Sequence, residues 1–265
     1  MRLRRLRAAV GALTVLAVLS ACSGSPAEPT PPGSGSPSPS PTASGPDIPG
    51  ITATATPDTS EYTATIAHVR GKQIDVSKTP GGPTSSTLKA KDVLTVPDQT
   101  PLVLLVKQVT ADGVEVYLPV RPNGTTGWVD PSDVDLYSTD LQLDIYHKDH
   151  TLTVSQAGQI IATYPIATGQ DDMPTPGGVY FIRELLAPPD PKGLYGPYAY
   201  GLSGYSPVLD NFNGGDAVIG IHGTNEPNSI GKDISHGCIR MYNDDVTALV
   251  ETWQLPLGTP VYIHE

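Results

Sequence analysis

Apolar and polar residues alternate along much of this chain, with the period of strands rather than helices. Between residues 114 and 120 every second residue is Val or Leu, which predicts a strand with one buried face. The same period recurs in residues 140–155, where the polar run from His147 to His150 divides the two strands of a hairpin. Further strands are predicted at 62–69, 102–109, 159–167, 178–184 and 217–222.

One segment near the C-terminus has the helical period instead. Four apolar residues fall at positions i, i+3, i+4 and i+7 of one face, namely Val246, Leu249, Val250 and Trp253. Asn243 is the predicted N-cap, and the two aspartates after it suit the positive end of the helix dipole. The predicted fold class is therefore mainly β, with one main helix.

Turn signals divide residues 61–138 into short strands, so this region is predicted to be a small β-barrel domain. It resembles the small bacterial Src-homology-3-like barrels, whose late strand often carries the Gly-Trp-Val found here at 127–129. Barrels of that kind bind cell-wall peptides or separate other domains. Spacing or scaffolding is the favoured interpretation, with Trp128 in the core.

Residues 139–265 form the second predicted domain. Its histidines His147, His150 and His264 lie in polar or terminal sequence and are interpreted as solvated surface groups. Residues 185–205 contain four tyrosines among Pro and Gly and are predicted to be a long loop. Long loops in compact domains are often functional, so this one is interpreted either as a substrate lid or as a packed surface loop.

The N-terminus has the pattern of an export signal over residues 1–21. Four arginines precede an uncharged stretch from Ala8 to Ser20, which at thirteen residues is too short to span a bilayer. The stretch ends in Leu-Ser-Ala-Cys and resembles the lipobox of bacterial lipoproteins, which implies a lipidated Cys22 in the outer leaflet of the cell membrane. An ordinary secretory signal, with Cys22 incidental, is the alternative.

Residues 22–60 are predicted to be a disordered linker. They are dominated by Pro, Gly, Ser and Thr and contain no aromatic residue, so they cannot bury enough apolar surface to offset the entropy of ordering. An O-glycosylated stalk has the same composition. The predicted location is extracytoplasmic, with the folded part lipid-anchored and reaching into the cell wall.

Charge argues against one class of partner. The chain has 27 acidic residues and 16 Lys plus Arg, a net charge of −11. Loss of the four leader arginines would leave twelve basic residues and a net charge of −15. Because nucleic-acid-binding surfaces are basic, nucleic acid is not a predicted partner.

The two cysteines, Cys22 and Cys238, provide no disulfide framework. Outside the cytoplasm an unpaired thiol is a liability unless it is buried or used. Thiols titrate near about 8.5 and become reactive at neutral pH beside an imidazole or a positive charge. His222 and His236 lie close to Cys238 in sequence, and this set suits acyl transfer. A buried thiol beside a core histidine is the structural alternative.

Two motifs around these residues follow a specific pattern. Ile-His-Gly-Thr-Asn at 221–225 is followed after nine residues by Ser-His-Gly-Cys-Ile-Arg-Met at 235–241. Together they resemble the active-site signature of the L,D-transpeptidases of the YkuD family, with supporting motifs at 168–178 and 257–261. The resemblance implies a β-sandwich-like catalytic domain over residues 139–265, acting as a cysteine acyltransferase without cofactor or metal.

The resemblance also implies individual roles. Cys238 would be the nucleophile and His222 the general base, with the carbonyl of Gly223 orienting the imidazole. The residues that would support the site or form its oxyanion hole are Ser235, His236, Gly237 and the amide of Cys238. The candidate substrate contacts are Arg240, Thr224, Asn225 and Tyr205. Arg240 would bind a carboxylate of the substrate in bidentate geometry or form a structural ion pair.

The implied partner is the peptidoglycan stem peptide. A thioester on Cys238 would release D-Ala from tetrapeptide stems and give 3→3 cross-links that maintain cell-wall organisation and cell shape. With water as acceptor the chain would be an L,D-carboxypeptidase, and with a protein Lys it would attach that protein to the wall. A non-catalytic wall-binding lipoprotein is the alternative from another class.

A zinc site is the competing chemical interpretation of His222, His236 and Cys238. Three ligands with an open position are typical of catalytic zinc. The sequence offers no second cysteine pair and no further histidine nearby, so zinc is disfavoured and no metal is predicted.

Overall fold

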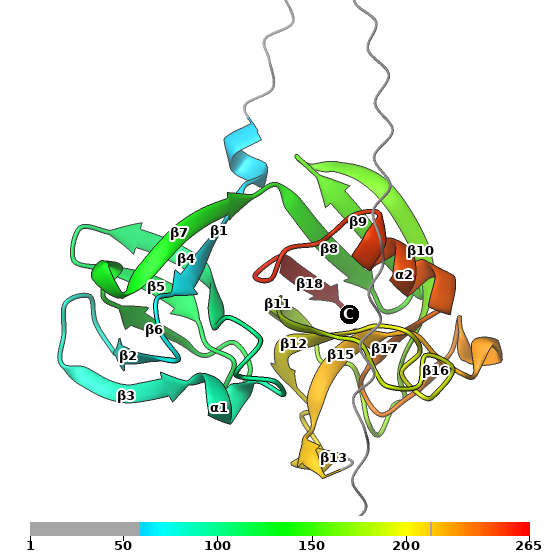
Figure 1. The fold of residues 1–265 in the computed structure, drawn as a ribbon. Helices are drawn as coiled ribbons and strands as arrows, with labels where there is room; N and C mark the ends of the chain where they lie inside the picture. The colour runs from blue at the N-terminus through cyan, green and yellow to red at the C-terminus, as the bar shows by residue number, and fades with distance from the viewer. Residues whose placement is uncertain (1–58, 213) are drawn as a thin grey trace, which may run out of the picture. The chain divides into compact units, whose positions relative to one another are not determined.

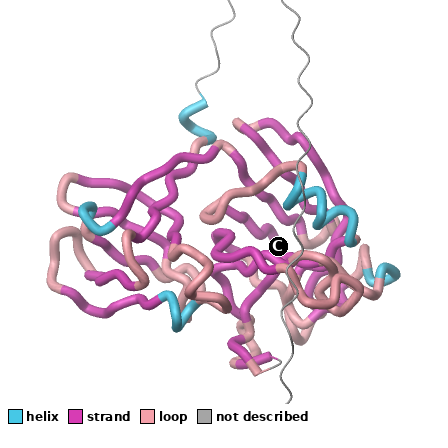
Figure 2. Tube along the Cα trace, in the orientation of Figure 1, coloured by secondary structure: helices cyan, strands magenta, loops and turns pink. Residues whose placement is uncertain are grey.

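The computed structural model describes residues 59–212 and 214–265. The predicted signal at 1–21, Cys22 and nearly all of the predicted linker lie outside the described residues. Figure 2 shows a chain built mainly of strands joined by loops, with a few short helices. No helix in this part is both long enough and apolar enough to cross a membrane. The mainly β fold class is confirmed.

A seven-stranded sheet is built from residues 64–139, coloured blue to green in Figure 1. Its order is β3-β2-β6-β5-β4-β1-β7. The strands are β1 (Ala64–Val69), β2 (Gln73–Ser77), β3 (Thr84–Lys89), β4 (Val103–Thr110), β5 (Gly113–Tyr117), β6 (Thr126–Val129) and β7 (Val134–Thr139). The helical turns in and before this region are η1 (Thr59–Tyr62), α1 (Ala90–Val93) and η2 (Pro131–Asp133).

This sheet curves around its own apolar core. The first part of β4 pairs with β1 and the rest pairs with β5, so the sheet turns at this strand. Side chains buried inside it include Ile74, Leu104 and Val116. The arrangement is the barrel-like sheet that the turn spacing predicts.

Three details of this region differ from the sequence prediction. Strands β2, β3 and β7 were not predicted; β3 is mostly Ser and Thr with exposed side chains, so it has no apolar period. Glu115 is buried although it alternates with the valines, because Lys107, Gln108 and Thr126 all donate hydrogen bonds to its carboxylate. Trp128 is half-buried rather than in the core.

The second sheet has nine strands in the order β16-β10-β17-β15-β12-β11-β18-β8-β9. They are β8 (Leu141–Tyr146), β9 (Thr151–Gln156), β10 (Gln159–Gly169), β11 (Gly178–Leu186), β12 (Ala199–Tyr205), β15 (Val218–His222), β16 (Asp233–Ser235), β17 (Ile239–Met241) and β18 (Pro260–His264). The remaining elements are the hairpin β13 (Asn211–Phe212) and β14 (Gly215–Asp216), the turn η3 (Pro227–Ser229) and the helix α2 (Asn243–Glu251).

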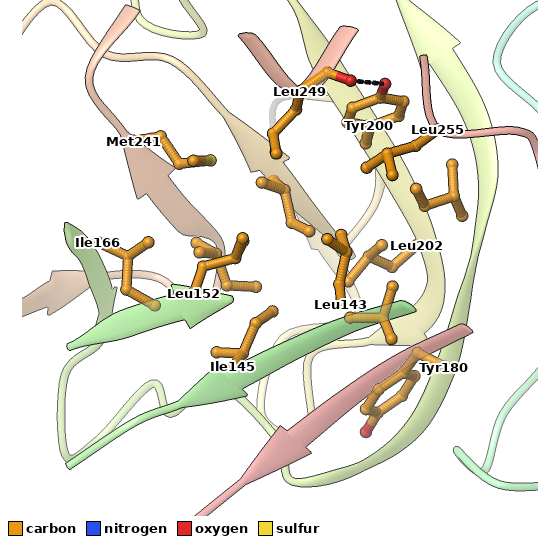
Figure 3. Packing of buried hydrophobic residues seen from close by; sticks show 14 of the residues in the cluster. Leu143, Ile145, Leu152, Ile166, Tyr180, Tyr200, Leu202, Met241, Leu249 and Leu255 are labelled. Carbon is orange, nitrogen blue, oxygen red and sulfur yellow. Dashed lines mark hydrogen bonds between the residues drawn. The ribbon is translucent and has the colours of Figure 1, made fainter. Parts of the chain in front are cut away.

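Two long strands make this sheet a sandwich. The first part of β10 pairs with β9 and its end pairs with β17, while β11 pairs first with β18 and then with β12. Each strand therefore passes from one layer to the other. Leu143, Ile145 and Leu202 are among the side chains that fill the space between the layers (Figure 3).

Helix α2 closes one side of this core. Val246 and Leu249 are fully buried, as the helical period predicts, and the Tyr200 hydroxyl donates a hydrogen bond to the carbonyl of Leu249 (Figure 3). The predicted N-cap is wrong. Tyr242 holds that position, and Asn243 Oδ1 accepts from the backbone N–H of Thr224 instead.

Two further predictions for this region need correction. The loop predicted over 185–205 is wrong at both ends, because β11 continues to Leu186 and β12 occupies Ala199–Tyr205. The histidines are also not simply solvated. His147 and His150 both contact Asp233 Oδ1, at 3.0 and 2.9 Å, and His264 pairs with a carboxylate of β8 at 2.7 Å. A nearby carboxylate holds each ring in place.

Candidate active site

Two parallel strands bring the predicted catalytic residues to one side of the second sheet. In the pairing of β15 with β17, Ile221 lies beside Ile239 and His222 lies beside Arg240. Side chains alternate along a strand and register partners face the same way. Cys238, directly before β17, therefore shares a face with His222 and Arg240, and all three line one cavity.

The Cys238 thiol is half-buried and unpaired. Its Sγ lies 3.8 Å from the carbonyl oxygen of Val218. Burial raises the pKa of Cys238, because the thiolate loses hydration; the backbone of Gly220 and the charge of Arg240 oppose this effect. At neutral pH the thiol is protonated until a base removes its proton.

His222 lines the same cavity as Cys238. Its Nδ1 lies 2.6 Å from the carbonyl oxygen of Gly223, which can only accept, so Nδ1 carries the proton and Nε2 is the free acceptor. Burial lowers the pKa of His222 to about 4, with the nearby charge of Arg240 acting in the same direction. The imidazole is therefore neutral at neutral pH, as a general base must be.

The ring of Tyr195 packs edge-on against the imidazole of His222, with the ring centroids 4.9 Å apart. Tyr195 belongs to residues 187–198, the part of the predicted loop that is irregular. It lines both cavities that reach Cys238. Of the two interpretations of the loop, the position of Tyr195 favours a role at the site.

The turn before Cys238 is held by its own residues. Ser235 Oγ donates to the carbonyl of Cys238 at 2.6 Å and accepts from the amide of Gly237 at 3.0 Å. Gly237 has a φ of 112°, and a Cβ there would lie 2.9 Å from the side chain of Ile219. Ser235 thus fixes the turn. The Gly237 amide is engaged inside it, not held toward the substrate as the oxyanion prediction requires.

Thr175 is a positioning residue that the sequence did not single out. The residue is 3% exposed. Its Oγ1 accepts a hydrogen bond from the amide of Gly169 at 2.8 Å and donates one to the carbonyl of Gly237 at 2.9 Å. This hydroxyl connects the end of β10 to the turn that carries Cys238. A threonine between two prolines has no chemical signature of its own, so the surrounding motif was the one available signal.

Arg240 has a partner in the structure. Its Nη1 donates to Glu226 Oε2 at 2.7 Å, and its side chain is 10% exposed against 62% for Glu226. The structural ion pair is therefore present. Arg240 also lines the cavity beside Cys238, and carboxylate binding there stays a prediction.

The remaining predicted residues lie at different places. His236 is exposed and lines the cavity of Cys238, and its ring centroid lies 5.4 Å from that of Phe212. Thr224 and Asn225 line a separate pocket of about 420 Å³. Tyr205 is buried, and its hydroxyl donates to the carbonyl of Pro119 at 2.8 Å. The structure does not place these last three in the cavities that reach Cys238.

Two cavities meet at Cys238 and His222. One encloses about 40 Å³ and the other about 720 Å³. As for a metal site, the described residues contain no group of three His, Cys, Asp or Glu placed to hold an ion. The site has the parts for acyl transfer: a thiol, a neutral imidazole and an open route to both.

Comparison with known proteins agrees with this geometry. Residues 141–263 match the model of the YkuD family, described as an L,D-transpeptidase catalytic domain. The Bacillus subtilis (strain 168) protein named as the L,D-transpeptidase YkuD is 37% identical over 134 residues, which cover 51% of this chain and 72% of that protein. The Bacillus subtilis protein named as the L,D-transpeptidase YqjB is 34% identical over 121 residues, covering 44% of this chain and 68% of that one.

Solved structures give a weaker likeness. L,D-transpeptidase 3 from Mycobacterium tuberculosis aligns at 17% identity and a TM-score of 0.38, covering 53% of this chain and 74% of that one. The L,D-transpeptidase from Mycobacterium smegmatis aligns at 18% identity and a TM-score of 0.39, covering 62% and 90%. The assignment rests on the sequence relatives, and on that ground this chain belongs to the YkuD family of L,D-transpeptidases.

Proposed function

We propose that the protein is a peptidoglycan L,D-transpeptidase that works through a thioester on Cys238. Its family implies an acyltransferase activity. The observation that supports the cysteine mechanism is the shared cavity of Cys238 and His222, with His222 Nδ1 committed to the carbonyl of Gly223. That hydrogen bond leaves Nε2 free to accept the thiol proton.

The reaction begins with both groups neutral. His222 takes the proton of Cys238 as Sγ attacks the carbonyl carbon of the third residue of a tetrapeptide stem. The C–N bond to the terminal D-Ala breaks, and the leaving amine takes the proton back from the imidazolium. The products are free D-Ala and a thioester, and His222 is neutral again. The amide of Cys238 is the remaining oxyanion donor of the two predicted.

The second half transfers the acyl group. The side-chain amine of the diamino acid in another stem attacks the thioester, and His222 removes the proton that this nitrogen loses. A C–N bond forms, the C–S bond breaks and the thiol is restored. The product is a 3→3 cross-link, the bond through which this enzyme would maintain cell-wall organisation and cell shape.

The proposed location is the outer face of the cell membrane. The leader sequence and Cys22 support a lipid anchor, and the Pro/Ser/Thr/Gly-rich segment after it supports a tether that lets the enzyme reach the wall. Labelling with a radioactive fatty acid tests the anchor. Wild type should incorporate label, and a Cys22→Ser chain that does so equally would contradict lipidation.

Disaccharide-tetrapeptide is the substrate that tests the reaction. Purified protein with its thiol reduced should convert it to a dimer that has lost one D-Ala, seen by mass. A monomer shortened by D-Ala would instead indicate a carboxypeptidase, and transfer to an added protein lysine would indicate wall attachment. Unchanged substrate would contradict all three and leave the non-catalytic wall-binding protein.

A further inference from the structure

The larger of the two cavities at Cys238 is partly built by the first sheet region. Its lining includes the five consecutive residues 91–95, which follow β3 and contain most of α1. The opposite walls come from the second sheet region, between β11 and β15. The groove therefore runs from the barrel to the nucleophile.

Size decides which cavity can hold a peptide. About 40 Å³ accommodates little more than a water molecule, whereas about 720 Å³ lies within the range of ligand sites. Both cavities touch Cys238 and His222. Of the two cavities, the one that the barrel lines therefore has room for a stem peptide that acylates Cys238.

The barrel wall is fixed in place. Glu184, 1% exposed on β11, accepts from the backbone N–H of Thr95 at 2.8 Å and from its hydroxyl at 3.1 Å. Arg183 donates to the same carboxylate. The two bonds at Thr95 hold residues 91–95 against β11, which also lines the groove.

Two cationic side chains line the groove, and they differ in exposure and in the strength of their ion pairs. The Arg183 side chain is 6% exposed and paired with Glu184, so it is committed to the fold. The Lys91 side chain is 71% exposed and pairs with Asp92 at 2.6 Å, itself 52% exposed. Such solvent-exposed pairs are weak, so a substrate carboxylate can replace Asp92 at little loss.

We propose that residues 91–95 of the barrel form one side of the substrate-binding groove, and that Lys91 binds a carboxylate of the stem peptide there. The inference rests on the proposed function and deepens it. It gives the barrel a part in substrate recognition in place of a spacing role. Lys91 acts on binding and not on the chemical step at Cys238.

The test compares charge reversal at two exposed lysines of the barrel. Lys91→Glu is set against Lys78→Glu, which makes the same change outside the cavity lining. D-Ala release is measured with two forms of disaccharide-tetrapeptide. In the free acid all stem carboxylates are unmodified; in the amidated substrate the side-chain carboxylate and the diamino-acid carboxylate of the stem are amides. For the free acid we expect Lys91→Glu to raise KM roughly three- to tenfold with kcat unchanged, and Lys78→Glu to leave both unchanged.

Two more results complete the test. For the amidated substrate, Lys91→Glu and Lys78→Glu should give the same KM. Asp92→Asn, which frees Lys91 from its ion pair, should lower KM for the free acid. Equal KM values for the two reversals with active wild type would overturn the inference and leave the proposed function intact. The inference would also be overturned if Lys91→Glu raised KM for the amidated substrate as much as it raised KM for the free acid. If wild type releases no D-Ala, the proposed function fails first and the inference fails with it.

Discussion

The imidazole of His222 is buried, whereas the proposed reaction requires it to exchange protons. Burial in the cavity wall lowers its pKa to about 4, and the bond to Gly223 keeps one tautomer. A base with so low a pKa is always available at neutral pH but is weak. In the proposed reaction the proton of Cys238 would therefore move during attack rather than before it.

The burial of His222 also affects the stability of the folded protein at acid pH. In the unfolded chain a histidine titrates near about 6.5, so between that pH and about 4 the unfolded state binds a proton that the folded state does not. His222 thus lowers the free energy of unfolding as pH falls through this window, by up to about 3 kcal/mol, and has no effect above it. Urea denaturation of wild type and His222→Gln at several pH values measures this. Parallel pH profiles would contradict the burial argument.

Thiol reactivity tests the other half of the pair. Because burial raises the pKa of Cys238, we expect its alkylation by iodoacetamide to accelerate with pH until well above the ordinary range of a free thiol. The measurement uses a Cys22→Ser background, and Cys238→Ala in that background is the control. A fast, pH-independent rate extending below about pH 6 would mean that a thiolate–imidazolium pair exists in the free enzyme, contrary to this account.

Residues with distinctive chemistry were the predictable ones. Cys238 and His222 stand in a motif that resembles the signature of the family, and this resemblance pointed to them. Gly223 was predicted as the group that orients the ring, and its carbonyl contacts His222 Nδ1. Thr175 was not predicted as a positioning residue. Its hydroxyl hydrogen-bonds the backbone of residues 169 and 237, which are 68 residues apart in sequence. Such a contact exists only after folding.

At the scale of elements, the contact between β11 and residues 91–95 depends on one carboxylate. Removing Glu184 would leave Arg183 buried without its ion-pair partner and Thr95 without either bond. We expect Glu184→Ala to lower the free energy of unfolding by about 3–5 kcal/mol. Asp98→Ala, at an exposed pair with Lys72, should leave it unchanged. Urea denaturation measures both, and similar midpoints for the two variants would contradict the role of Glu184.

Strand prediction succeeded where one face is apolar and failed where it is not. The hairpin of β8 and β9 was predicted because its apolar residues alternate and are buried. Strand β12 was assigned to a loop because Gly and Ser separate its large residues, although Tyr200 and Leu202 are fully buried. Small residues there have a packing reason: a Cβ at Gly204 would overlap the ring of Tyr180, which the sequence cannot reveal.

Across the molecule, the barrel is joined to the catalytic region by specific bonds. The Arg121 guanidinium donates to the carbonyls of Ser206 and Leu209, at 2.6 and 2.8 Å. The Asn123 amide pairs with both backbone groups of Tyr205, at 2.8 and 2.9 Å. Since Ser206 and Leu209 line the smaller cavity at Cys238, the barrel supports a wall of the site. These contacts favour scaffolding over spacing, and no alternation pattern could have predicted them.

Under the proposed mechanism, Cys238 forms a covalent acyl-enzyme with the help of His222. The decisive measurement is the intact mass of the protein after incubation with a carbapenem, a β-lactam that can acylate a nucleophilic thiol. We expect one adduct per wild-type chain, no adduct on Cys238→Ala, and an adduct that forms far more slowly on His222→Gln. An unmodified wild-type mass, or an adduct that survives loss of Cys238, would contradict it.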